Sequence, residues 1–135
     1  MDKLKRRLEV ANAAFDTLRE ALAVEQPSSL ERDGAIQRFE YSFEALWKAC
    51  QTYLEQVEGV QCASPRACLR AMGAVGLMNT GETVAALAMA DDRNLTVPTY
   101  NEVLARKIWL FRNICGYDRM AAFCNSLSRI VFHAA

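Results

Sequence analysis

Apolar residues recur at helical spacing along most of the chain, beginning with residues 3–25. There they follow one another at gaps of four and three, which places them on one face of an α-helix, as in bundles and coiled coils. These positions are Leu4, Leu8, Ala11, Phe15, Leu18 and Leu22. The pattern predicts a long first helix with a continuous apolar seam.

A second long helix is predicted to begin after Ser28 and to stop at Gly59. Ser28 and Glu31 fit a capping box, and glycine is a usual residue just past a helix end. The helix is rich in aromatic residues. Its expected inward positions are Ile36, Phe39, Phe43, Leu46, Trp47, Cys50, Leu54 and Val57.

Shorter helical segments follow, over 64–76 with Ser64 as cap and Gly76 as stop, over 81–90, over 99–115 and over 117–133. Their expected inward positions are Leu69, Met72 and Val75, then Val84 and Leu87, then Val103, Leu104, Ile108, Phe111 and Ile114, and finally Met120, Phe123, Cys124, Leu127, Ile130 and Val131. No window alternates with period two, so no strand is expected. We predict one all-α domain over residues 1–135, an up-and-down four-helix bundle with an additional short helix.

Composition fits a soluble globular protein of 135 residues, 52% hydrophobic and 24% charged. Because charges come early in "MDKLKRRLEV", we expect no signal peptide, and no apolar run is long enough to span a membrane. We therefore expect a cytoplasmic protein. Five cysteines without a CxxC pair then predict reduced thiols that pack as small hydrophobes.

The residues for most common active sites are absent. His133 is the single histidine, the cysteine spacings fit no zinc pattern, and no GxGxxG, GxxxxGK[ST] or GxSxG occurs. We expect neither a metal nor a cofactor. Net charge is zero, but residues 93–135 carry six basic and two acidic side chains. This excess fits either an anionic partner or a solvated face.

Two polar stretches stand out from the helical pattern. In "RFEYSFEALWK", residues 38–48, Glu40 and Glu44 lie one turn apart beside an apolar stripe. They are either solvated carboxylates or partners for an arginine from elsewhere in the fold. In "DDRNLTVPTYNE", residues 91–102, a polar linker with a helix cap explains Thr99 and Glu102 but does not explain Arg93.

These stretches, in this order, resemble the HEPN superfamily of helical bundles, in particular its nucleotidyltransferase substrate-binding-protein branch. "RFEYSFEALWK" follows that branch's approximate RFEYTFELAWK, and "SPRACLRAMGAVGL" looks like its SPRE-type helix. "DDRNLTVPTYNE" looks like its RN-x-T-x-H-x-Y-[ND]-E segment. The resemblance covers roughly residues 30–120. It implies a homodimer that binds a separate minimal nucleotidyltransferase.

In this superfamily an arginine and a following histidine form a ribonuclease site, and the paired nucleotidyltransferase transfers AMP to a tyrosine two residues past the histidine. The resemblance assigns these roles to Arg93 and Tyr100, but Pro98 stands at the histidine position. Proline has no ionisable side chain to move a proton near neutral pH. We therefore predict a non-catalytic subunit that binds a nucleotidyltransferase, a nucleotide or both.

The resemblance implies a binding set of Arg93, Asn94, Thr96, Tyr100, Glu40 and Glu44. In it Arg93 contacts phosphate, Asn94 and Thr96 shape the loop, and the two glutamates orient Arg93 across the bundle. Tyr100 is either an AMP acceptor or a ring packed on the bundle. Two alternatives stay open: a ribonuclease toxin of a toxin–antitoxin pair, which cleaves RNA with another base, and a structural adaptor.

Overall fold

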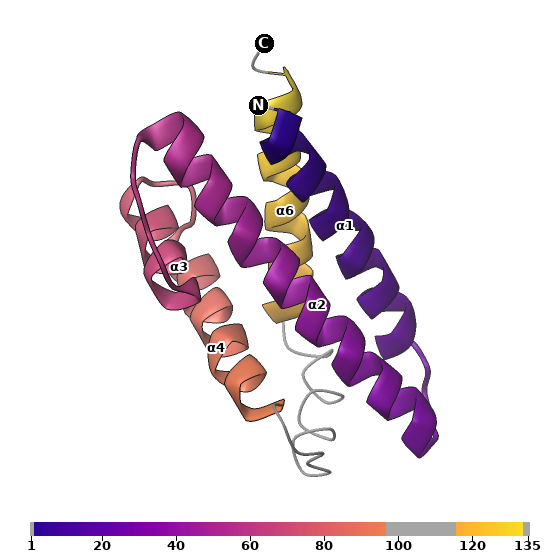
Figure 1. Cartoon of the computed structure of the whole chain (residues 1–135). Helices are drawn as coiled ribbons and strands as arrows, with labels where there is room; N and C mark the ends of the chain where they lie inside the picture. Colours follow the sequence, from indigo (N-terminus) through magenta and orange to yellow (C-terminus); the bar gives the residue numbers. More distant parts are fainter. Residues whose placement is uncertain (1, 97–115, 134–135) are drawn as a thin grey trace.

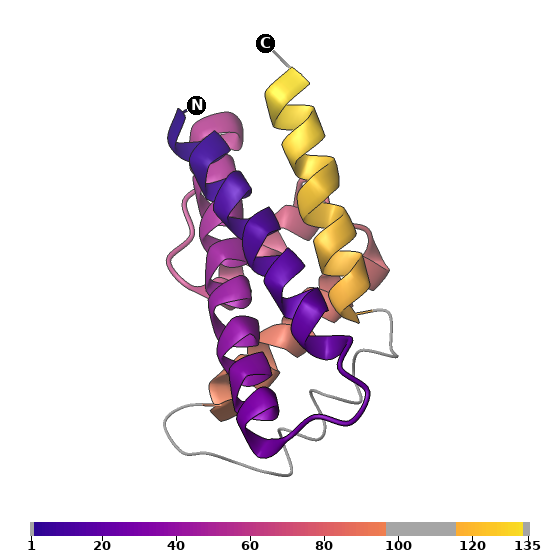
Figure 2. The same ribbon diagram turned by 90° about the vertical axis from the view of Figure 1, so that its right-hand side faces the viewer.

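The computed structural model describes residues 2–96 and 116–133 (Figure 1). Within these ranges the chain forms α1 (Asp2–Leu22), α2 (Ser29–Tyr53), the π-helical turn η1 (Leu54–Glu58), α3 (Pro65–Ala74), α4 (Thr80–Thr96) and α6 (Gly116–His133), and no strand. The long helices run alternately up and down, so that α1 begins and α6 ends at the same end of the bundle (Figures 1 and 2). The predicted all-α helical bundle is confirmed, and the helix expected over 99–115 lies outside the described residues.

The apolar seam of α1 packs against α2 and α6 to form the centre of the core. All six predicted seam positions are buried, and Phe39, Phe43 and Leu46 of α2 are at most 1% exposed. The capping box at the start of α2 is also present. The Glu31 amide donates to Ser28 Oγ at 3.1 Å, and the Ser28 amide donates to Glu31 Oε1 at 2.9 Å. Such a cap contributes about 0.5–2 kcal/mol, so neighbouring residues are enough to determine this helix start.

The end of α2 differs from the regular helix that the sequence predicts. The last residues of this helix form the wider π-helical turn η1, and the helix ends at Gly59. Gly59 has a φ of 67°, in the left-handed region that glycine adopts more easily than other residues. A π-helical turn bonds each residue to the fifth one on, which rotates the following side chains relative to an α-helix. Leu54 stays fully buried, whereas Val57 is 47% exposed. The expectation that Val57 faces inward is wrong for this reason.

The helix α4 is longer than predicted. It begins with a capping box between Asn79 and Glu82, with hydrogen bonds of 2.8 and 2.9 Å, and continues to Thr96. Residues 91–96 are therefore helical and do not form a loop that Asn94 and Thr96 could shape. Neither glycine nor proline interrupts the chain between Glu82 and Pro98, so nothing in the covalent structure stops the helix earlier.

Two further positions expected to face inward are exposed, Val84 by 63% and Ile130 by 50%. On α4 the buried positions are instead Ala86, Met89 and Ala90. Leu87, the other position predicted to face inward, is partly buried and packs against the core. Alanine adds little to an apolar pattern, so the sequence did not reveal Ala86 and Ala90 as core positions and placed Val84 there instead. On α6 the remaining predicted positions are buried, and Asn12 Nδ2 on α1 donates to Ser128 Oγ at 2.7 Å.

Cys62 and Cys68 form a disulfide, with Cα atoms 5.3 Å apart. The prediction of reduced thiols is therefore wrong for this pair. Ser64 and Pro65 start α3 between the two cysteines, so the chain turns and brings them within bonding distance. Cys50 and Cys124 are buried free thiols, as predicted, and Cys115 lies outside the described residues. No helix in the described ranges is long and apolar enough to cross a membrane.

Candidate functional site

Glu40 and Glu44 lie at the border between the core and the surface of α2. Each follows a core phenylalanine, Phe39 or Phe43, and successive helical residues are turned by about 100°. The two carboxylates therefore share one edge of the helix, one turn apart. Their side chains are 30% and 38% exposed. This edge faces α4, which packs against α2.

Arg93, near the end of α4, lies between these two carboxylates. Its Nη1 is 3.5 Å from Glu40 Oε2, and its Nε is 3.6 Å from Glu44 Oε1. A carboxylate of the 38–48 stretch thus pairs with an arginine from elsewhere in the fold, the second of the two alternatives that the sequence left open. The Arg93 side chain is 23% exposed. We call Glu40, Glu44 and Arg93 the carboxylate–arginine cluster.

Trp47 completes the surroundings of Glu44. Its Nε1 donates to Glu44 Oε2 at 3.1 Å, while Oε1 of the same carboxylate faces Arg93. The two oxygens of Glu44 thus have different partners, and the half-buried indole packs against the core. This contact fixes the direction of the carboxylate. The apolar pattern predicted Trp47 only as a core residue, although its spacing of three from Glu44 on a helix also predicts such a contact.

Two carboxylates share one guanidinium among the described residues of the cluster. Asp92, the neighbour of Arg93 in the chain, is only 3% exposed. Near a protein surface, charges a few ångströms apart interact appreciably. The cluster is therefore a charged site in which Arg93 lies between two acidic side chains.

A second ion pair connects α3 to α4 close to the cluster. Arg66 Nη1 contacts Asp91 Oδ1, and the two side chains are 39% and 65% exposed. Asp91 precedes Arg93 by two residues, so this pair anchors the last turns of α4 from the α3 side. No pattern in the sequence predicts this pair, because its partners are 25 positions apart and lie on different helices.

The side chains of the other predicted site residues lie outside the described part of the structure. Asn94 and Thr96 belong to α4, but their side chains are outside the description, as are Pro98 and Tyr100 altogether. The predicted contacts of these residues therefore stay predictions. Among the described residues, no group of three or more histidine, cysteine, aspartate or glutamate side chains is arranged to hold a metal ion.

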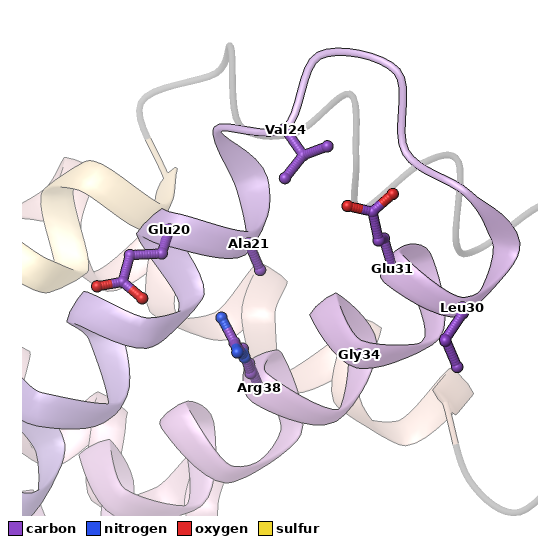
Figure 3. Close-up of a pocket in the computed structure, with 7 residues that line it drawn as sticks. All are labelled: Glu20, Ala21, Val24, Leu30, Glu31, Gly34 and Arg38. Atoms are coloured by element: carbon purple, nitrogen blue, oxygen red, sulfur yellow. The ribbon is translucent and has the colours of Figure 1, made fainter.

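A surface pocket of about 340 Å³ lies where α1 ends and α2 begins (Figure 3). It is lined by Glu20, Ala21, Val24, Leu30, Glu31, Gly34 and Arg38. Two of its charged groups have partners within the chain, since Glu31 belongs to the capping box and Arg38 Nη1 donates to the Thr17 carbonyl at 2.8 Å. None of the predicted site residues lines this pocket.

The fold defines the class, an all-α helical bundle. The chain belongs to the nucleotidyltransferase substrate binding protein like family, whose sequence profile matches residues 6–129. It is also similar to a Thermus thermophilus protein of known crystal structure, with 49% identity and a TM-score of 0.78 over 88% of this chain and 98% of that chain. Among curated proteins, none matches.

Proposed function

We propose that this chain is a non-catalytic subunit that binds a minimal nucleotidyltransferase through the carboxylate–arginine cluster. The observation that carries the proposal is the position of Arg93, which Glu40 and Glu44 orient while its side chain stays 23% exposed. Arginine is enriched among the residues that dominate binding energy at protein interfaces. An arginine that is already oriented also loses less conformational entropy when a partner binds. The family name supports a nucleotidyltransferase as the partner.

The electrostatics favour a protein group over a nucleotide phosphate as the ligand of the cluster. A phosphate has to displace at least one carboxylate before it can form two parallel hydrogen bonds to Arg93. A lysine or arginine of the partner, in contrast, can share the two carboxylates without displacing either of them. We therefore assign the nucleotide to the nucleotidyltransferase and the cluster to the protein–protein contact.

The surroundings of Arg93 also support a non-catalytic role over the alternative of a ribonuclease. The charged residues that contact it on α2 are Glu40 and Glu44, and no histidine is among them. His133, the single histidine of the chain, closes α6 at the end of the bundle opposite to the end where α4 stops (Figure 1). It is too distant to act together with Arg93 as an acid or base.

Titration of this chain with a minimal nucleotidyltransferase tests the proposal. Arg93→Ala should weaken binding roughly thirtyfold, since hot-spot residues contribute about 2 kcal/mol or more. Glu40→Gln should weaken it less, because Glu44 still orients the guanidinium. Arg129→Ala, which removes an exposed arginine of α6, is the matched control and should bind like the wild type.

Two outcomes contradict different parts of the proposal. Equal affinities of wild type and Arg93→Ala mean that the partner binds elsewhere on the chain. Absence of binding by a folded wild type to an active nucleotidyltransferase rejects the function itself. Circular dichroism of each variant separates both outcomes from unfolding.

The same mixture, with ATP and magnesium, tests Tyr100 as an AMP acceptor. In that reaction the phenol oxygen forms a bond to the α-phosphorus of ATP, pyrophosphate leaves and the phenol proton is released. The peptide that contains Tyr100 should gain the mass of AMP, and Tyr100→Phe should abolish the gain. An unmodified peptide beside an active enzyme leaves Tyr100 as a packing residue.

A further inference from the structure

The disulfide closes a short ring around the start of α3. The ring runs from Cys62 to Cys68 and contains Ser64, which caps α3 through the Ala67 amide at 3.2 Å. Both ends of the ring are anchored. Gln51 Nε2 on α2 donates to the Cys62 carbonyl at 2.8 Å, and Cys68 is fully buried. The ring therefore fastens the start of α3 to α2 and to the core.

One residue inside the ring contacts α4. Arg66 pairs with Asp91, which lies two residues before Arg93. Arg93 in turn lies between Glu40 and Glu44. A continuous set of contacts thus leads from the disulfide, through Arg66 and the last turns of α4, to the carboxylate–arginine cluster. Any change in the freedom of the ring changes how firmly Arg66 holds Asp91.

We propose that the Cys62–Cys68 disulfide is a reversible redox latch that sets how firmly the last turns of α4, and with them Arg93, are held. The latch deepens the proposed function and rests on it, because it regulates the same cluster. In the oxidised chain the ring holds Arg66 against Asp91. In the reduced chain the ring opens, the start of α3 loosens and this anchor of α4 weakens.

The chemistry is thiol–disulfide exchange with a dithiol reductant. A reductant thiolate attacks the sulfur of Cys62, which is half-buried, whereas Cys68 is fully buried. The sulfur–sulfur bond breaks, and Cys68 leaves as a thiolate that takes up a proton. The second thiol of the reductant then releases Cys62. Two electrons and two protons pass to the cysteines, and the reductant becomes a disulfide.

Reduction should leave the bundle folded. A short ring stabilises a fold less than a long one does. The ring also includes no residue of α1 or α6, and the main packing of the bundle is that of α1 against α2 and α6. The effect of the latch should therefore be local to α3 and to the end of α4, as expected when parts of a protein open independently.

Hydrogen exchange of the full chain, with and without dithiothreitol, tests the latch. On reduction, amide exchange at the start of α3 should rise roughly tenfold, because this segment loses its covalent anchor. Exchange over residues 88–93 should rise about two- to fivefold, the range that an exposed ion pair can account for. Exchange in α1 should not change. Iodoacetamide should label the half-buried Cys62 only after reduction, while Cys50 and Cys124 stay unlabelled as buried internal controls.

Variants assign the effect to the contacts described. Cys62→Ser should behave like the reduced wild type. Arg66→Ala should raise exchange at the end of α4 and remove its response to dithiothreitol, whereas Arg70→Ala, one turn further along α3 and exposed, should keep the response. Identical exchange over 88–93 in both redox states, or labelling of Cys62 before any reductant, overturns the latch. Hydrogen exchange and iodoacetamide labelling are both measured without the nucleotidyltransferase. Their results therefore test the latch even if the nucleotidyltransferase does not bind.

Discussion

The described cysteines are of two chemical kinds, a disulfide pair and two buried free thiols. Cys62 and Cys68 are bonded to each other, whereas Cys50 and Cys124 are free thiols inside the core. Burial raises the pKa of the Cys124 thiol to about 12. It also raises the pKa of Cys50 well above its ordinary value, with a further contribution from the charge of nearby Cys124. Both core thiols therefore stay protonated and unreactive near neutral pH.

These raised pKa values predict a loss of stability at alkaline pH. Between about pH 9 and pH 10 the unfolded chain releases the Cys124 proton while the folded chain retains it, so the free energy of unfolding falls as the pH rises. The fall should be steeper for the wild type than for Cys124→Ala, by up to about 1.4 kcal/mol per pH unit. Guanidinium denaturation followed by circular dichroism measures both slopes, and parallel slopes contradict the burial of this thiol.

At the scale of the elements, the contact between α3 and α4 depends on a glycine. A Cβ atom added at Gly73 would lie 2.8 Å from Thr83 Oγ1, and that hydroxyl donates to the Asn79 carbonyl at 2.9 Å. The absence of a side chain on Gly73 lets α3 approach α4 closely. Since Arg66 on α3 pairs with Asp91 on α4, this approach also brings the two partners of that ion pair together.

Two glycine substitutions should change stability in opposite directions. Gly73→Ala should lower the free energy of unfolding by about 1–3 kcal/mol, the usual cost of overpacking. Adding Thr83→Ala should recover part of this loss, because it removes the atoms that clash. Gly34→Ala, inside α2 with nothing within 4 Å of the new Cβ, should stabilise by up to about 1 kcal/mol. Urea denaturation measures all three, and equal effects at the two glycines contradict the close approach of α3 and α4.

At the scale of the whole molecule, the bundle leaves apolar side chains on its surface. Among the described residues, the most exposed of the large ones are Leu30 at 81%, Val84 at 63%, Val10 at 56% and Ile130 at 50%. Single exposed apolar residues are ordinary, but these lie on four different helices of a small chain. Their number is consistent with surface left over for self-association, which the family resemblance also implies.

We therefore predict a homodimer in dilute solution. Light scattering at micromolar concentration should give a mass twice that of the 15.1 kDa chain. Raising the salt concentration should not dissociate the dimer, because salt screens charges but does not weaken apolar burial. A mass of one chain at micromolar concentration contradicts this prediction.

The sequence by itself determined the fold class and most helix starts. The seam of α1, the capping box at Ser28 and the cap at Ser64 are each encoded by residues within a few positions of one another. Local hydrogen bonds and the 3.6-residue period act over this short range, so a pattern in the chain is enough to predict them. The sequence also singled out Glu40, Glu44 and Arg93, through composition and resemblance.

Only the tertiary structure decided which of these residues meet. Arg93 and its two carboxylates are about fifty positions apart, and their contact depends on how α4 is rotated against α2. A helix turns by about 100° per residue, so a shift of one position moves a side chain from the core to the surface. Val84 was misplaced in this way. The Cys62–Cys68 bond likewise required the turn into α3, because a spacing in sequence does not fix a distance in space.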